Sequence, residues 1–254
     1  MTLLLGALLA CVAAPPPPMA PSAVVVEKAA APALLPDGWL EQVVGAPDEG
    51  QPLPMVVMVH GLGDQPQSML GLMAALPGPA RVVAPRAPDR WNDGWSWFPT
   101  RASGDEVALS AQMAKVADRF VVDLEAVQQA RPTIGKPILS GFSQGGMLSF
   151  TVAVHHPDAV SLAVPVAGWL PEPLWPEGGP PAGAAPIHAL HGLDDSVLPF
   201  ERTSEGVGAL RAKGWDVSMQ AFPAVAHRVP PQVRRALFLE VQGALPAAPE
   251  ASAP

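Results

Sequence analysis

A serine between two glycines is the strongest sign of chemistry in this sequence. Ser143 is the centre of Gly141-Phe142-Ser143-Gln144-Gly145, a G-x-S-x-G pattern. Such glycines let the chain make a sharp, strained strand-to-helix turn that projects a nucleophilic hydroxyl clear of a sheet. A strand expected at 137–141 and a helix expected at 144–154 place Ser143 at a helix N-terminus, where free N–H groups favour a developing oxyanion. A glycine-rich turn that carries an ordinary surface serine is the alternative.

A serine hydroxyl needs a base to activate it, and the base needs a third group to hold it. Of the six histidines, His227 alone lies downstream of an acidic loop and at the carboxyl end of an expected strand, at 217–222. The acidic loop carries Asp194 and Asp195, of which only one can face the imidazole. The order serine, acid, histidine is typical of one class of serine hydrolases. A plain aspartate turn is the alternative for the acidic pair.

The elements that must position these residues alternate between strands and helices. Short apolar runs bounded by Pro or Gly predict buried strands, and apolar residues with a period near 3.6 predict helices. We expect strands at 55–60, 80–84, 137–141, 159–167, 187–191 and 217–222, and helices at 67–76, 105–130, 144–154, 200–213 and 231–245. The alternation predicts an α/β fold, with a mainly parallel central sheet covered by helices on both faces. Sites in such folds form at the carboxyl ends of the strands.

The motifs taken together resemble the phospholipase/carboxylesterase family of the α/β-hydrolase fold, which includes acyl-protein thioesterases. The matching segments follow the family order over residues 37–245 and are 60–64 (HGLGD), 85–88, 95–98 (WSWF), 141–146, 167–171 (AGWLP), 191–199 and 226–227. The resemblance implies that Ser143 is the nucleophile, Asp195 the acid and His227 the base. It also implies an oxyanion hole formed by the backbone N–H groups of Leu62 and Gln144. The mechanism that it implies needs no metal and no organic cofactor.

Aromatic residues near these motifs indicate where a substrate would bind. Trp97, Phe98 and Trp169 lie in expected loops and not on periodic faces, so we expect them to line an apolar acyl pocket beside the serine. Surface packing is the alternative for these side chains. The segment 88–95 is short for a flexible acyl-groove loop, which favours short to medium acyl esters over long lipids.

The expected function is therefore a serine hydrolase that cleaves carboxylic esters through an acyl-enzyme on Ser143. Its partner would be a small-molecule or lipid ester. One alternative is an acyl thioesterase or lysophospholipase of the same fold. Another is a binding lipoprotein that has kept the fold without the catalysis.

Composition narrows the classes of function. A chain of 254 residues that is 49% hydrophobic and 15% charged is too apolar to be disordered and long enough to bury a large core. The net charge of −8, with no basic cluster, argues against nucleic-acid binding. A single cysteine excludes an intramolecular disulfide and a zinc site built from several thiolates. Nothing in the sequence indicates an oligomeric state.

The N-terminal segment has the pattern of an export signal. Residues 1–14 form an apolar run that is too short to cross a bilayer but matches the hydrophobic part of a signal. Cys11 follows Leu8-Leu9-Ala10, as in the lipobox of bacterial lipoproteins, although no Lys or Arg precedes the run. The pattern predicts an exported protein that is anchored to the membrane through a lipidated Cys11. An apolar N-terminus on a cytoplasmic protein is the alternative.

Three segments follow from these patterns. A signal or lipobox-like leader and a Pro/Ala-rich tether are expected over 1–36, since residues 12–36 contain seven prolines and almost no charge. The α/β-hydrolase catalytic domain is expected over 37–245, and a disordered tail over 246–254.

Overall fold

The computed structural model describes residues 35–47, 50–99 and 105–246. The chain divides into a unit of residues 1–31 and a unit of residues 32–254, and the described residues all belong to the second. The predicted leader, with Cys11, lies outside the described residues, as do all but two residues of the predicted tether and all but the first residue of the predicted tail. Among the described helices, none combines the length and the apolar character needed to span a membrane.

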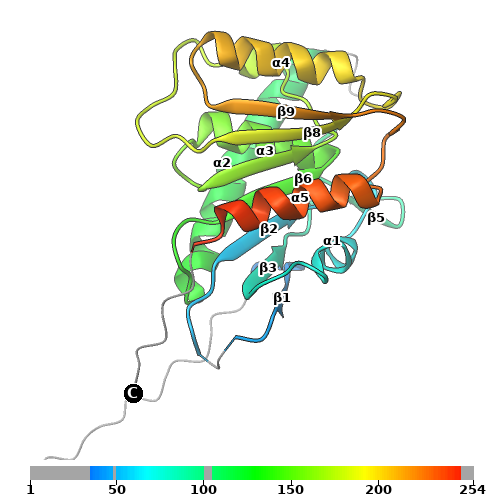
Figure 1. The fold of residues 1–254 in the computed structure, drawn as a ribbon. Coiled ribbons are helices and arrows are strands. Elements are labelled where there is room, and N and C mark those ends of the chain that lie inside the picture. Colours follow the sequence, from blue (N-terminus) through cyan, green and yellow to red (C-terminus); the bar gives the residue numbers. More distant parts are fainter. Residues whose placement is uncertain (1–34, 48–49, 100–104, 247–254) are drawn as a thin grey trace, which may run out of the picture. The chain divides into compact units, whose positions relative to one another are not determined.

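A seven-stranded sheet forms the centre of the described fold (Figure 1). The strands lie in the order β1-β3-β2-β6-β7-β8-β9, and all neighbours in this sheet are parallel except β1 and β3. They are β1 (Leu40–Val44), β2 (Met55–Val59), β3 (Ala80–Ala84), β6 (Ile138–Phe142), β7 (Leu162–Val166), β8 (Ile187–Gly192) and β9 (Val217–Phe222). The predicted mainly parallel sheet is therefore confirmed.

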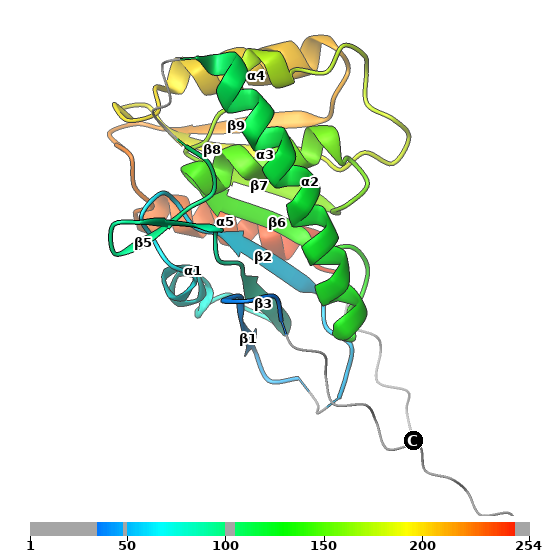
Figure 2. The ribbon, with the colours of Figure 1, turned by 180° about the vertical axis from the view of Figure 1, so that it is seen from behind.

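Helices cover both faces of the sheet. They are α1 (Pro66–Met73), α2 (Glu106–Ala130), α3 (Gln144–His155), α4 (Phe200–Ala212) and α5 (Pro231–Ala244). Figure 1 shows α1 and α5 in front of the strands, and Figure 2 shows α2 and α3 on the opposite face. The buried side chains form two clusters, one beneath α1 and α5 and the other beneath α2, α3 and α4.

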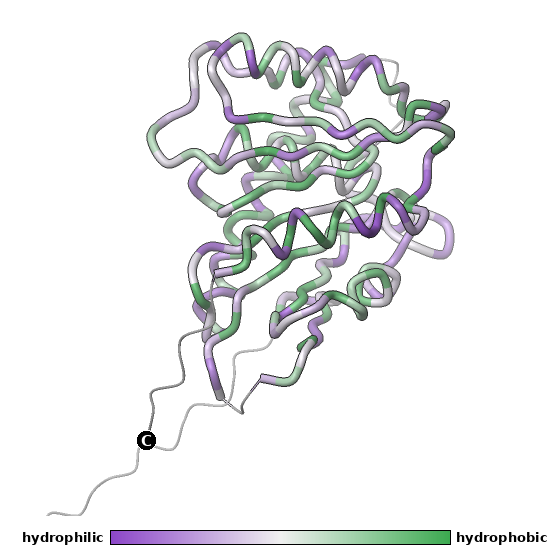
Figure 3. Tube along the Cα trace, in the orientation of Figure 1, coloured by the Kyte–Doolittle hydropathy of each residue, from purple (hydrophilic) through white to green (hydrophobic). Residues whose placement is uncertain are grey.

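The central strands are apolar because both of their faces are buried. Along β2, Met55, Val57 and Val59 join one cluster, while Val56 and Met58 join the other. In Figure 3, β2 is an unbroken hydrophobic segment, whereas α5 alternates between apolar and polar residues. The alternation of side chains across a strand thus explains why a run without polar residues predicts a strand at this place.

Some elements of the structure were not predicted from the sequence. The edge strand β1 is one, and the short 3₁₀ helix over Glu172–Leu174 is another. The segment 88–95, expected to be a loop, contains a hairpin of β4 (Asp89–Trp91) and β5 (Gly94–Ser96). The hairpin pairs with the loop after β2, because Gly63 N–H donates to the Trp95 carbonyl at 2.8 Å. The strand expected over 159–167 is shorter, since β7 covers Leu162–Val166.

Candidate active site

The carboxyl edge of the sheet brings a hydroxyl, an imidazole and a carboxylate into one hydrogen-bonded series. Ser143 follows β6, Asp195 follows β8 and His227 follows β9. His227 Nε2 lies 2.9 Å from Ser143 Oγ, and its Nδ1 lies 2.7 Å from Asp195 Oδ2. With Nδ1–H donated to the carboxylate, Nε2 carries the lone pair that accepts the serine proton. The arrangement can therefore remove a proton from the hydroxyl.

The turn that carries Ser143 is strained in the way its sequence predicts. Ser143 has φ of 58° and ψ of −118°, which a residue with a side chain rarely adopts. The glycines on either side are needed for close packing: a Cβ on Gly141 would lie 2.4 Å from the Gly145 carbonyl oxygen, and one on Gly145 would lie 2.1 Å from the Val59 carbonyl oxygen. Such strain, of about 1–3 kcal/mol, persists where the surrounding structure enforces it.

The predicted oxyanion donors lie on two segments that meet at this turn. Gln144 is the first residue of α3, so its backbone N–H has no partner within the helix. Leu62 lies in the loop after β2, and that loop packs against Ser143: a Cβ on Gly61 would lie 3.3 Å from Ser143 Cβ. The structure therefore places both segments beside the serine.

His60 braces the loop that carries Leu62. Its Nδ1 donates to the Gly61 carbonyl oxygen at 2.7 Å, and its Nε2 accepts the Ala87 N–H at 3.2 Å. These two bonds require a neutral ring with the proton on Nδ1. His60 is fully buried, and burial lowers the pKa of its imidazole despite the opposing effects of the Gly61 carbonyl and the Asp64 charge. His60 is thus held neutral as a structural donor and acceptor.

The side chain of Gln144 has a contact that was not predicted from the sequence. Its Nε2 donates to the Phe98 carbonyl at 2.7 Å, and its Oε1 accepts the Trp97 N–H at 3.0 Å. The residue after Ser143 therefore holds the segment that follows β5. No local pattern indicates such a contact, since the partners are 46 and 47 positions apart.

The acid loop is fixed by its own backbone and by a second histidine. Asp195 Oδ1 accepts the Val197 and Leu198 N–H groups at 3.0 and 2.9 Å, while Asp194 is exposed. His191 Nε2 lies 2.8 Å from the Leu198 carbonyl oxygen and 3.4 Å from Asp195 Oδ2. The sequence did not single out His191 for a role of its own. It opens the segment 191–199, and only the turn of that segment brings it to the carboxylate.

His191 also links the acid loop to the segment after β7. With its proton on Nε2, His191 accepts the Thr203 hydroxyl at Nδ1 over 3.0 Å, and the same Oγ1 lies 2.7 Å from the Gly168 carbonyl oxygen. Burial, the largest effect, lowers the pKa of His191. Through these contacts, the buried imidazole connects β8 to α4 and to the segment that contains Trp169.

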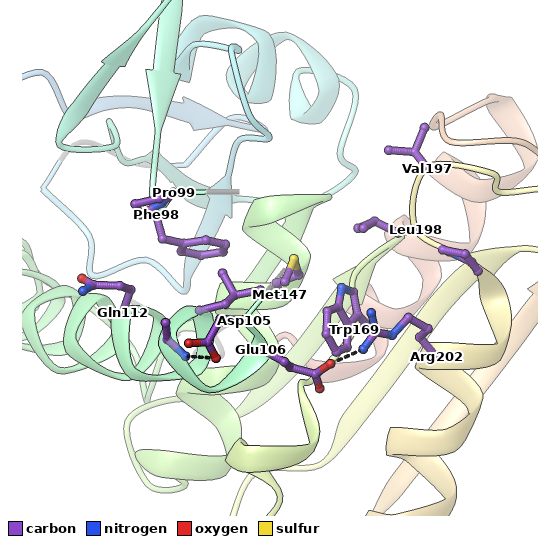
Figure 4. Close-up of a pocket in the computed structure, with 13 residues that line it drawn as sticks. Phe98, Pro99, Asp105, Glu106, Gln112, Met147, Trp169, Val197, Leu198 and Arg202 are labelled. Carbon is purple, nitrogen blue, oxygen red and sulfur yellow. Dashed lines mark hydrogen bonds and ion pairs between the residues drawn. The ribbon is translucent and has the colours of Figure 1, made fainter. Parts of the chain in front are cut away.

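An apolar cavity of about 400 Å³ lies beside these elements (Figure 4). Phe98, Met147, Trp169 and Leu198 line it. Three of them are bonded to the series or to the residue after Ser143: Met147 N–H donates to the Ser143 carbonyl, Leu198 N–H donates to Asp195, and the Phe98 carbonyl accepts from Gln144. Its volume lies within the usual range of small-molecule sites.

Charged side chains close one side of this cavity. The Arg202 guanidinium lies 3.6 Å from the centre of the Trp169 ring and 2.5 Å from Glu106 Oε2. Figure 4 shows this ion pair beside Trp169, at the edge of the apolar side chains. The pair joins α4 to the start of α2.

Trp97 does not line this cavity, although it was expected there with Phe98 and Trp169. It lines a second cavity, on the other side of the segment. The chain bends at Trp97 and Phe98, directly after β5, and the two neighbouring side chains line different cavities. Among the described residues, no group of three or more His, Cys, Asp or Glu side chains is arranged to hold a metal ion.

The fold is shared with solved esterase structures. The structure of esterase PE8 superposes with a TM-score of 0.68 over 80% of this chain and 100% of that chain, at 20% sequence identity. A likeness at this identity shows the fold alone, and the fold is that of an α/β-hydrolase.

Sequence comparison gives the family within that fold. A family model described as Phospholipase/Carboxylesterase matches residues 41–238, so the chain belongs to this family. NocK from Nocardia uniformis subsp. tsuyamanensis is 33% identical over 165 residues, which cover 63% of this chain and 45% of that protein. Acyl-protein thioesterase 1 from Gibberella zeae is 25% identical over 214 residues, covering 73% of this chain and 88% of that protein. The match thus spans less than half the length of the first relative.

Proposed function

We propose that this chain is a serine hydrolase that cleaves carboxylic esters with short to medium acyl groups. The observation that carries the proposal is the hydrogen-bonded series from Asp195 through His227 to Ser143 Oγ. Membership of the phospholipase/carboxylesterase family supports ester hydrolysis in general. The relative named acyl-protein thioesterase supports the same class of acyl transfer.

Acylation would use the groups in the order in which they are bonded. Ser143 Oγ attacks the ester carbonyl carbon while His227 Nε2 takes the hydroxyl proton, and Asp195 stabilises the imidazolium. The backbone N–H groups of Leu62 and Gln144 donate to the oxyanion, and each such donor is worth about 2.7–4 kcal/mol. When the tetrahedral intermediate collapses, the ester C–O bond breaks and His227 gives its proton to the leaving alcohol.

Deacylation would repeat these steps with water. His227 Nε2 takes one proton from a water molecule as its oxygen bonds to the acyl carbon. Collapse of the second intermediate breaks the bond to Ser143 Oγ, which recovers its proton from His227. The carboxylic acid then leaves.

The proposed acyl site is the cavity lined by Phe98, Met147 and Trp169. Its walls are apolar near the serine turn, which suits a hydrocarbon chain. One side of the cavity is polar, because the Glu106–Arg202 pair lies there. Burying more methylene groups against a charged pair gains little, so this side favours short to medium chains.

Substitution of the nucleophile tests the proposal. Ser143→Ala is expected to lower turnover of p-nitrophenyl butyrate by at least about 10³-fold, with an unchanged circular dichroism spectrum. Ser196→Ala is a matched control, because this exposed hydroxyl makes no hydrogen bond within the described residues, and it should keep full activity. Turnover retained by Ser143→Ala would contradict the assignment.

Two alternatives are separated by further assays. A thioesterase or lysophospholipase of the same fold would prefer thioesters or lysolipids in a substrate panel matched for acyl length. A non-catalytic binding lipoprotein would fail to react with a fluorophosphonate probe. Labelling of the native chain that is lost in Ser143→Ala supports the serine hydrolase.

Anchoring through Cys11 is a separate proposal, based on the leader sequence. Expressed in a bacterial host that processes lipoproteins, the full chain should incorporate radiolabelled palmitate, and Cys11→Ser should abolish this. Incorporation that survives the substitution, or that is absent from the native chain, would contradict anchoring.

A further inference from the structure

A second cavity, of about 430 Å³, lies on the other side of the segment that carries Phe98. Its apolar lining includes Trp39, Trp97 and Phe120, and α2 forms one wall. Figure 2 shows α2 crossing this face of the fold. The Phe120 ring lies 5.7 Å from Trp39 and 6.0 Å from Trp97 between ring centres, and these three side chains, only 2–7% exposed, form the apolar floor of the cavity.

The rim of this cavity carries an excess of one positive charge. Arg86 pairs with Asp37 at 2.5 Å, and Arg119 pairs with Asp123 at 2.9 Å. The fifth charged residue of the lining is Lys115, which is exposed and makes no hydrogen bond or ion pair within the described residues. On a chain of net charge −8, an unpaired cation beside an aromatic cavity marks a place that favours an anion with an apolar tail.

The same cavity is in direct contact with the loop that carries Leu62. The indole Nε1–H of Trp97 donates to the His60 carbonyl at 2.9 Å, and the two rings lie 5.3 Å apart. Ala87, another lining residue, donates its N–H to His60 Nε2. A molecule that packs against Trp97 would therefore restrain the residue that positions Gly61 and Leu62.

We propose that this cavity is a second binding site, which takes an amphipathic monocarboxylate with its tail against Trp39, Trp97 and Phe120 and its head group beside Lys115. A medium-chain carboxylate is also the acid that the proposed reaction releases. This link to the product rests on the proposed function, whereas the cavity and its charge do not. Because the ligand restrains Trp97, its binding should tighten the oxyanion loop and raise kcat.

Binding is tested by calorimetric titration of octanoate, below its micelle concentration, into the full chain. Labelling with an alkyl fluorophosphonate first blocks the serine and the adjacent acyl cavity. Val116→Phe fills the second cavity without a change of charge, and Lys115→Glu reverses the unpaired charge. Lys136→Glu is the matched control, because it changes the net charge equally and Lys136 lines neither cavity.

The labelled native chain and Lys136→Glu are expected to bind one octanoate with equal affinity. Lys115→Glu should bind about fivefold more weakly, the effect of losing a surface ion pair and gaining a repulsion. Val116→Phe should show no binding. The proposed site would be overturned if the labelled native chain did not bind octanoate. It would also be overturned if Lys115→Glu and Lys136→Glu bound octanoate with equal affinity. If the chain does not label, the proposed function fails, and the same variants still test the second site in unlabelled protein.

The effect of octanoate in the second cavity on kcat is measured at a saturating concentration of ester. The ester then displaces octanoate from the active site. Octanoate should raise kcat about twofold in the native chain and in Lys136→Glu, a change of about 0.4 kcal/mol in the barrier. Val116→Phe should show no rise. Binding that leaves the kcat of the native chain unchanged would overturn the coupling to the oxyanion loop.

Discussion

The side-chain amide of Gln144 donates to the Phe98 carbonyl at 2.7 Å, so the residue after Ser143 joins the serine turn to a wall of the proposed acyl cavity. The backbone of the same residue supplies a proposed oxyanion donor. One residue thus has two separable tasks, because a substitution of its side chain leaves its backbone N–H in place. The position of the cavity wall is in this way tied to Ser143.

Gln144→Ala is expected to weaken both stability and activity. It leaves the Trp97 N–H buried without a partner, which costs about 1–3 kcal/mol, whereas the Phe98 carbonyl keeps the Ser96 hydroxyl as a donor at 3.0 Å. Urea unfolding should show this loss, and kcat/KM for p-nitrophenyl butyrate should fall by about tenfold as the wall moves. Gln129→Ala, on the exposed side of α2, is the control. Native stability in Gln144→Ala would show that the two bonds do not hold the segment.

His191 is expected to position the catalytic carboxylate. His191→Asn removes the contact with the Leu198 carbonyl and lets the acid loop move, so kcat should fall by about 10–100-fold. KM should change less than kcat, because Phe98 and Met147, which lie outside this loop, still line the cavity. His188→Asn, three positions earlier on β8 and partly exposed beside Glu240, should keep native kcat. A fall in stability alone, with native kcat in the folded fraction, would limit His191 to a structural role.

Arg202 is expected to limit the length of the acyl chain. Arg202→Ala removes the guanidinium from the Trp169 ring and breaks the pair with Glu106. The preferred p-nitrophenyl ester should then shift to longer chains, since each methylene buried in the freed space gains about 0.8 kcal/mol. Activity on the acetate should stay within about twofold, because a short chain does not reach this side. Arg234→Ala, an exposed change on α5, is the control, and an unchanged profile in Arg202→Ala would contradict this limit.

Local sequence predicted the elements that are buried on both faces. Met55–Val59 has no polar residue because its side chains enter two cores, and this pattern needs no knowledge of the partners. The edge strand Leu40–Val44 was missed because it contains Glu41 and Gln42. The carboxylate of Glu41 is held by Arg81 and Arg131, contacts that only the folded chain creates.

The hairpin at 89–96 had a local signal that was not used. Asn92-Asp93-Gly94 is a turn sequence between two tryptophans, and Asn92 has φ of 50°, as such turns require. The positions of Ser143 and His227 at strand ends followed from the alternation of elements. The contacts of Gln144 with Phe98 and of His191 with Leu198 did not, because each joins loops through tertiary packing.

The two buried histidines, His60 and His191, should make the fold less stable in mild acid. Burial lowers the pKa of both side chains, so below the unfolded-state pKa of about 6.5 the unfolded chain binds protons that the folded chain does not. The free energy of unfolding should therefore be greatest above pH 7 and fall between pH 7 and 5.5. Each histidine contributes a slope of at most about 1.4 kcal/mol per pH unit.

Urea unfolding at pH 7.5, 6.5 and 5.5 measures this effect. His60→Gln and His191→Gln should each be less stable than the native chain at pH 7.5, because hydrogen bonds are lost. Their stability should nevertheless fall less steeply toward pH 5.5, because one titrating group has been removed. His188→Gln is the control for a substituted histidine that is partly exposed. If both variants keep the native slope, neither imidazole is held neutral by its burial, and the acid sensitivity must come from other groups.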